Sequence, residues 1–251
     1  MAGHNKWSKV KNIKGAIDAK RSKIFTKITK EIMVASRIGG GNPDTNARLR
    51  LAVQTAREAS VPKDNIERAI KKGTGELAGE AIEEVTYEGY GPGGVAVLVE
   101  TTSDNKNRTV ADLRNLFKSG GGNLGESGSV SWMFDRVGQL SFEPKTFSED
   151  KIMEVALEAG AQDVTTQSDG TIEVITATSD LYKVRDAFDK AQMIPNASGF
   201  AYVPKTSVPV DKEKAPQLLE LLESLEDHDD VQKVHANFDI DDKLLAELTA
   251  K

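Results

Sequence analysis

The chain has 251 residues, of which 38% are hydrophobic and 29% are charged, and its formal net charge at pH 7 is −6. It contains no cysteine, which excludes disulfide bonds, thiolate metal sites and a cysteine nucleophile. No apolar run approaches the roughly 18 residues that a membrane span needs. We therefore expect a soluble, cytoplasmic protein of about two or more domains with no membrane partner.

The first long helix is expected to start near Ile17, because apolar residues follow it at helical spacing, and to end at the glycine run 39–41. A second helix should follow, with Asp44 as its N-terminal cap, and a third is predicted over residues 62–73. Three helices joined by short connections indicate a small bundle over residues 1–75.

After residue 75 the apolar spacing changes from helical to alternating. Residues 85–87 and 95–99 alternate as strands do, on either side of a glycine-rich turn over 89–94. A helix over 110–117, a glycine-rich loop and a strand over 130–134 are expected next.

The segment from residue 136 to residue 205 predicts a unit of its own. It alternates strand and helix patterns in the order βαββαβ, which is typical of the ferredoxin-like fold. The dipeptide Asp169-Gly170 lies between two of its strands and is a strong signal for a two-residue hairpin turn.

One further helix, over 218–225, and one strand, over 234–238, cannot bury themselves alone. The segment 84–134 lacks one helix and one strand, so we expect 206–240 to return to it. The predicted fold class is therefore α+β and multidomain, with an N-terminal three-helix bundle and two ferredoxin-like α+β domains, one inserted into the other. The predicted domains are the basic bundle 1–75, a discontinuous α+β domain 76–135 and 206–240, an inserted domain 136–205, and a C-terminal tail 241–251.

Local motifs do not indicate an enzyme. The glycines Gly89, Gly91 and Gly94 match G-x-G-x-x-G, but a strand follows them where a dinucleotide site needs a helix, so a hairpin turn is the better interpretation. The spacing of His228 and His235 fits no zinc signature, and the many aspartates near them predict a solvated acidic surface. We predict no catalytic residue, no metal and no cofactor.

The charge is divided unevenly along the chain. Residues 1–75 contain 17 basic and 6 acidic residues, a net charge of +11, whereas residues 76–251 carry a net charge of −17. This asymmetry indicates a basic module that binds a polyanion, joined to an acidic body that does not.

Four lysines of the first long helix are spaced three, four and three residues apart, which places them in one stripe. Such arrays bind phosphate backbones with little sequence information. A solvated helix face is disfavoured because like charges repel at this spacing, and a membrane surface because the apolar face lacks bulk. The predicted nucleic-acid-binding residues are Lys6, Lys9, Lys11, Lys14, Lys20, Arg21, Lys23, Lys27, Lys30, Arg48 and Arg50.

Two further features of the sequence leave two interpretations open. Lys106 and Arg108, beside a predicted helix start, are either phosphate contacts or part of a flexible connector and cap. Trp7 is either a stacking partner for a base or a hydrophobic anchor of the bundle.

Four segments of the chain resemble the YebC family: AGHNKW at 2–7, DAKRSKIFTKITKEI at 18–32, YEGYGPGG at 87–94 and GNLGESGSVSWMF at 122–134. The resemblance implies a helical bundle with two α+β domains, one inserted, and a non-enzymatic regulator of gene expression. Bacterial members are described as cytoplasmic DNA-binding transcriptional regulators. Mitochondrial relatives activate translation, and some bacterial members ease ribosomes through proline-rich stretches.

The resemblance leaves two partners open. We take duplex DNA as the expected partner, with ribosomal RNA and ribosomal proteins as the alternative. It assigns the matching basic positions of the family to Lys20, Arg21, Lys23, Lys27 and Lys30. No feature of the sequence indicates an oligomeric state.

Overall fold

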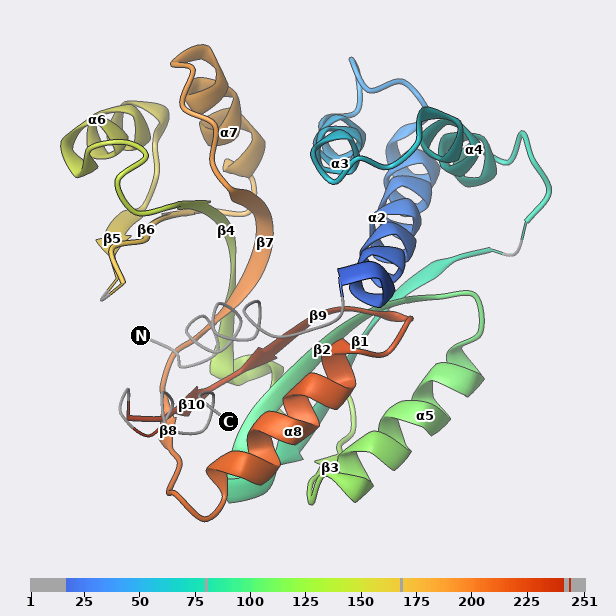
Figure 1. The fold of residues 1–251 in the computed structure, drawn as a ribbon, viewed down its shortest axis with the longest axis vertical. Helices are drawn as coiled ribbons and strands as arrows, with labels where there is room; N and C mark the ends of the chain where they lie inside the picture. The colour runs from blue at the N-terminus through green and yellow to red at the C-terminus, as the bar shows by residue number, and fades with distance from the viewer. Residues whose placement is uncertain (1–16, 80, 168, 242–243, 245–251) are drawn as a thin grey trace. The chain divides into compact units, whose positions relative to one another are not determined.

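A computed structural model of the chain describes residues 17–79, 81–167, 169–241 and 244, with side chains from residue 22 onward. The described residues form two compact units, one drawn from residues 17–133 and 204–244 and the other from residues 134–203. Figure 1 shows the helices and strands of both.

The first unit begins with three helices, α2 (Ile17–Gly39), α3 (Ala47–Glu58) and α4 (Lys63–Thr74). The expected cap at Asp44 is wrong, because Asn46 accepts the hydrogen bond from the backbone N–H of Leu49 at the start of α3. The Asn46 amide also donates to the carbonyl oxygens of Ala35 and Gly40. A buried amide can bond in both directions, so it caps α3 and fixes the end of α2 at once.

The three helices enclose a hydrophobic core of their own, which includes Ile32, Leu49, Val53 and Ile66. Helix α4 lies very close to α2, because a Cβ atom added at Gly73 would come within 2.4 Å of the Met33 carbonyl oxygen. Glycine at this position therefore allows the two backbones to approach each other.

A four-stranded antiparallel sheet follows, in the order β3-β1-β2-β9. Strands β1 (Glu83–Gly91) and β2 (Val95–Ser103) pair along their whole length around a short 3₁₀ turn, η1 (Pro92–Gly94). Gly93 in that turn has a φ of +81°, a left-handed conformation that glycine adopts without strain. The glycine motif is thus a hairpin turn, as its sequence context indicated.

Helices α5 (Lys106–Ser119) and α8 (Ala215–Glu226) cover one face of this sheet, as Figure 1 shows. Strand β3 (Asn123–Leu124) lies at one edge, and β9 (Val231–Ala236) pairs with β2 at the other. Two short parallel strands, β8 (Val208–Pro209) and β10 (Phe238–Asp239), flank the returning segment.

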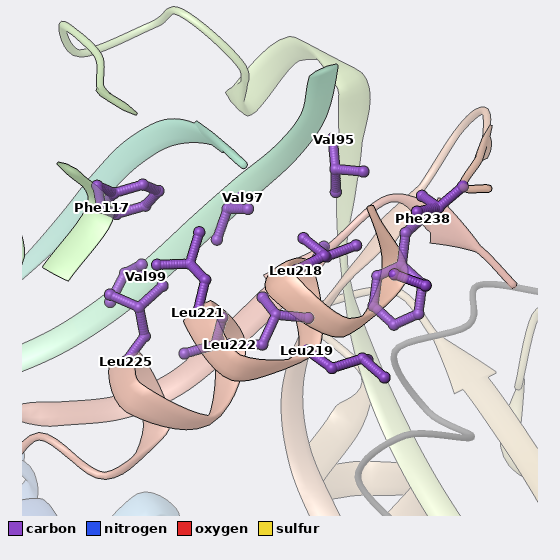
Figure 2. Close-up of a cluster of buried hydrophobic side chains, with 14 of the residues drawn as sticks. Val95, Val97, Val99, Phe117, Leu218, Leu219, Leu221, Leu222, Leu225 and Phe238 are labelled. Carbon is purple, nitrogen blue, oxygen red and sulfur yellow. The ribbon is translucent and has the colours of Figure 1, made fainter. Parts of the chain in front are cut away.

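The core of this sheet joins residues that are more than a hundred positions apart in the sequence. Leucines of α8 pack against the valines of β2, with Phe117 of α5 and Phe238 of β10 beside them (Figure 2). Each fully buried leucine or phenylalanine contributes about 1.5–3 kcal/mol relative to an exposed one. The segment after residue 204 therefore completes the sheet that starts at residue 83.

The second unit contains β4 (Phe134–Phe142), α6 (Glu149–Ala159), β5 (Asp163–Thr166), β6 (Ile172–Thr176), α7 (Leu181–Lys190) and β7 (Ala197–Pro204). Its sheet has the order β5-β6-β4-β7, with the first and third strands of the unit in the centre, as in the ferredoxin-like fold. The expected separate strand over 130–134 is wrong, because these residues form the 3₁₀ turn η2 (Ser131–Met133) and the first residue of β4.

The α+β multidomain fold class is confirmed. Each unit contains a four-stranded sheet with two helices. Their order along the chain is ββαβαβ in the first unit (β1, β2, α5, β3, α8, β9) and βαββαβ in the second. The further division of the first unit at residue 75 stays a prediction. Among the helices that the structure describes, none has both the length and the apolar character of a transmembrane segment.

Candidate nucleic-acid interface

The predicted basic site lies mainly on α2, and part of it lies outside the described residues. That part comprises Lys6, Lys9, Lys11 and Lys14. Lys20 and Arg21 belong to α2, but their side chains are also outside the description. The structure therefore places Lys23, Lys27 and Lys30 of the stripe, together with the other predicted contacts.

Two lysines of the stripe donate hydrogen bonds to the C-terminal end of α8. The Lys27 ammonium group lies 2.7 Å from the carbonyl oxygen of Glu226, and that of Lys23 lies 3.0 Å from the carbonyl oxygen of Asp227. Lys23 is also 3.7 Å from the Asp227 carboxylate. The last carbonyl groups of a helix have no partner within the helix and carry partial negative charge, so ammonium groups stabilise them.

The third lysine, Lys30, reaches the turn after α8. Its ammonium group lies 2.9 Å from the carbonyl oxygen of Asp229 and 2.7 Å from Oδ1 of Asp230. Only 3% of the Asp230 side chain is exposed, and its other carboxylate oxygen accepts hydrogen bonds from Ser103, Arg108 and Thr109.

Burial alone raises the pKa of the Asp230 carboxyl group. Hydrogen bonds from Lys30, Thr109 and Arg108, together with the Lys30 charge, outweigh burial and hold the pKa well below its usual range. The Asp230 carboxylate is thus charged in the folded protein at neutral pH, and it links the bundle to the sheet.

The two predicted arginines of α3 have different surroundings. Arg48 turns towards acidic residues, with Nε 2.7 Å from Glu31 and Nη2 2.6 Å from Glu84. Burial lowers the pKa of the Arg48 guanidinium group, but the hydrogen bonds and charges of the two glutamates outweigh it and raise the pKa above its usual value. Arg48 therefore joins α2, α3 and β1, and its charge is balanced within the protein.

Arg50, in contrast, is exposed on the opposite side of α3. It lies seven residues before Arg57, also exposed, and the two flank Gln54 on one stripe, whereas Leu49 and Val53 face the core. Helix α4 has four exposed basic residues, of which Lys63 pairs with Glu67 and the other three are Arg68, Lys71 and Lys72. We use the name outer cationic face for five cations that α3 and α4 expose: Arg50, Arg57, Arg68, Lys71 and Lys72.

Of the two predicted loop contacts, Lys106 pairs with Glu83 and lowers the pKa of that carboxyl group by a hydrogen bond and by its charge. Arg108 lies 2.8 Å from Asp104 and 3.0 Å from Asp230, and the hydrogen bonds from these two acids raise its pKa. Arg108 and Lys30 thus contact the same carboxylate, that of Asp230, whereas Lys106 contacts Glu83.

The glycine-rich loop contains an anchor that sequence reasoning missed. Glu88 of β1 is 6% exposed, and its carboxylate accepts hydrogen bonds of 2.7–2.8 Å from the backbone N–H groups of Gly128, Val130 and Ser131. Burial raises the pKa of Glu88, but these hydrogen bonds reverse the effect and lower it. Burial cannot be read from the sequence, so the signal that the sequence offers is weak: a single acid within the aromatic and glycine-rich run 87–94.

Beside this loop, Trp132 is 64% exposed. Its Nε1 donates to the carbonyl oxygen of Ser129, 3.2 Å away, and the Tyr90 hydroxyl group donates to the same oxygen at 3.0 Å. The loop therefore presents an indole ring to solvent with its polar edge already bonded. Within the part of the chain that the structure describes, no cluster of three or more histidines and acids could hold a metal ion.

Comparison with known proteins gives matches over nearly the whole chain. The family model described as TACO1/YebC protein N-terminal domain matches residues 5–76, and the one described as TACO1/YebC second and third domain matches residues 82–238. A protein of Syntrophobacter fumaroxidans named "Probable transcriptional regulatory protein" is 56% identical over 246 residues, 98% of each chain. One of the same name from Syntrophus aciditrophicus is 53% identical over 251 residues, 100% of each chain.

Among solved structures, the crystal structure of the conserved hypothetical protein Aq1575 from Aquifex aeolicus is similar to this chain. The two share 46% of their residues, with a TM-score of 0.85, over 90% of this chain and 93% of the other.

Proposed function

Since the chain belongs to the TACO1/YebC family, we propose that it is a non-enzymatic regulator of gene expression that binds nucleic acid through its N-terminal helices. The proposal takes duplex DNA as the first partner, in keeping with the names of the bacterial relatives. It takes Lys6, Lys9, Lys11, Lys14, Lys20 and Arg21 as further contacts.

The observation that carries the proposal is the outer cationic face. From residue 47 to residue 74 the chain has seven basic and three acidic residues. Arg48 is turned inward, whereas the five cations of the face are exposed on α3 and α4. Arginine binds phosphate with two donors in a fixed geometry, and both arginine and glutamine can read base edges, so the stripe Arg50, Gln54 and Arg57 suits a nucleic-acid duplex.

The test is reversal of charge on this face. The variant Arg57→Glu/Lys71→Glu should bind a duplex of random sequence at least about 10-fold more weakly than the wild type, and the slope of log affinity against log salt should fall by roughly 1–2. Fluorescence anisotropy at several salt concentrations measures both quantities.

The matched control is Lys151→Glu/Lys190→Glu, which makes the same change in net charge on exposed positions of the second unit. If both double variants lose affinity equally, general charge explains the binding and the assignment of the site is wrong. Circular dichroism of each variant verifies that the helices are intact.

A second candidate is a ribosome-associated translation factor, and the exposed ring of Trp132 favours it. Bases inside duplex DNA are not free to stack on a side chain, whereas single-stranded loops of RNA offer bases that stack on aromatic rings. Sedimentation of cell lysate through a sucrose gradient separates the two candidates. Movement of the wild type with ribosomes, but not of Trp132→Ala, supports the ribosomal candidate. A wild type that stays at the top argues against stable ribosome binding and makes the duplex measurement above the deciding test.

A further inference from the structure

Helix α2 carries cations that already have partners inside the protein. Lys23, Lys27 and Lys30 are one turn apart, and each donates to an oxygen atom in the segment 226–230 at the end of α8. These acceptors are about 200 residues away in the sequence, so the contact is tertiary. The lysines thus act as a C-terminal cap supplied to α8 by another helix.

Polar interactions mark this junction between the bundle and the sheet. The hydrophobic core around Ile32 and the core around Leu221 have no residue in common. The junction also includes the ion pair of Arg48 with Glu84. The Lys23–Asp227 and Arg48–Glu84 pairs are partly exposed, and such pairs are weak and are screened by salt. The Lys30–Asp230 pair, with its buried carboxylate, is therefore the main polar contact that has to open.

The acceptors at the α8 end resemble a phosphate backbone in their chemistry. They present a row of oxygen atoms with negative charge from the helix end and from the carboxylates of Asp227 and Asp230. An ammonium group binds either kind of oxygen as a compact point charge. Lys23 can exchange its oxygen partners more easily than Lys30, because 41% of the Lys23 side chain is exposed, compared with 18% of the Lys30 side chain.

We propose that the C-terminal end of α8 is an internal competitor for the lysines of α2, so that docking of the bundle on the sheet and binding of a nucleic-acid backbone to these lysines exclude each other. The inference rests on the proposed function, because it takes nucleic acid as the competing polyanion. The outer cationic face makes the first contact, and the α2 lysines add to binding once the junction opens.

Two substitutions test this competition, because they should change the affinity for duplex in opposite directions. Asp230→Asn weakens the internal competitor, so it should bind a random 20-base-pair duplex about 3- to 10-fold more tightly than the control. Lys27→Gln removes a shared cation, so it should bind the duplex more weakly. The control is Glu220→Gln, which removes the same charge as Asp230→Asn from an exposed position on α8.

A second measurement reports on the junction without nucleic acid. Because the chain has no cysteine, the substitutions Asn65→Cys on α4 and Asn115→Cys on α5 provide two labelling sites for energy transfer. In this double-cysteine protein the energy transfer should change with added salt. The same protein carrying Asp230→Asn should reach that change at lower salt than the one carrying Glu220→Gln. If Asp230→Asn fails to fold, the double variant Lys23→Gln/Lys27→Gln replaces it, because it removes two cations that donate to the end of α8.

The outcomes separate the two proposals. If neither DNA nor RNA duplex binds any variant, the proposed function fails, and the competition fails with it even if salt opens the junction. If the duplex binds but Asp230→Asn and Glu220→Gln have equal affinities and equal energy transfer, the competition is overturned and the proposed function stands. Tighter binding by Asp230→Asn with a change in energy transfer on adding the duplex supports both.

Discussion

Glu88 and Asp230 are both buried carboxylates in the first unit, and both have a lowered pKa, but they differ in what surrounds them. The donors to Glu88 come from a single loop, and they are three backbone N–H groups together with the Ser131 side chain. The donors to Asp230 are side chains, and one of them, Lys30, comes from the bundle. The backbone N–H groups are held in place by the conformation of the loop, whereas a lysine ammonium group can exchange one oxygen partner for another. Glu88 therefore fixes a loop, and Asp230 fixes a junction that can open.

The largest effect is expected from Glu88→Ala. It leaves three N–H groups of a partly buried loop without their acceptor, so the free energy of unfolding should fall by about 2–4 kcal/mol. Urea denaturation followed by circular dichroism measures this. The control Glu126→Ala changes an exposed acid of the same loop and should change stability by less than about 0.5 kcal/mol. Equal losses in the two variants would contradict the role given to Glu88.

The next effect is a dependence on pH. The pKa values of Glu88 and Asp230 are lower in the folded protein than in the unfolded chain, so the unfolded chain binds protons first as pH falls. Their contribution is complete above the ordinary carboxyl pKa of about 4 and is lost below it. Urea denaturation between about pH 6 and pH 3 should show a steeper loss of stability in the wild type than in Asp230→Asn. A parallel decline in the two proteins would contradict this account of Asp230.

The smallest effect distinguishes the lysines of the junction. Lys23→Gln should change the free energy of unfolding by less than about 0.5 kcal/mol, because its ion pair is exposed, and Lys30→Gln should cost about 1–2 kcal/mol, because it faces a buried carboxylate. Thermal unfolding at low salt measures the difference. An equal shift for both lysines would show that burial of the partner has no influence here.

Most of the fold could be predicted from the sequence because helix and strand periods depend on near neighbours. The three N-terminal helices and the hairpin at 89–94 follow from such patterns. The return of the segment after residue 204 was expected for another reason, since one helix and one strand cannot bury their apolar faces alone. The cap of α3 could not be predicted in the same way. Asp44 and Asn46 are both capping residue types, but only an amide can also donate to the carbonyl oxygens of Ala35 and Gly40.

The candidate site was predicted less completely. Spacing placed the lysines on one stripe, but it did not show that Lys27 and Lys30 meet oxygen atoms near residues 226–230. The prediction also grouped Arg48 with Arg50, because both are arginines of the second predicted helix, although two residues along a helix turn a side chain by about 200°. Arg48 therefore meets Glu31 and Glu84, and Arg50 lies on the exposed side.

The second unit leaves and rejoins the first at nearly one point. Its first and last strands, β4 and β7, are neighbours in the same sheet, and the backbone N–H of Lys205 donates to the carbonyl oxygen of Met133 just outside it. During synthesis the contiguous segment 134–203 is complete before β9 is made, whereas β2 must wait for β9 to emerge. The inserted unit can therefore fold first and bring the two halves of the other sheet together, which shortens the loop that β9 has to close.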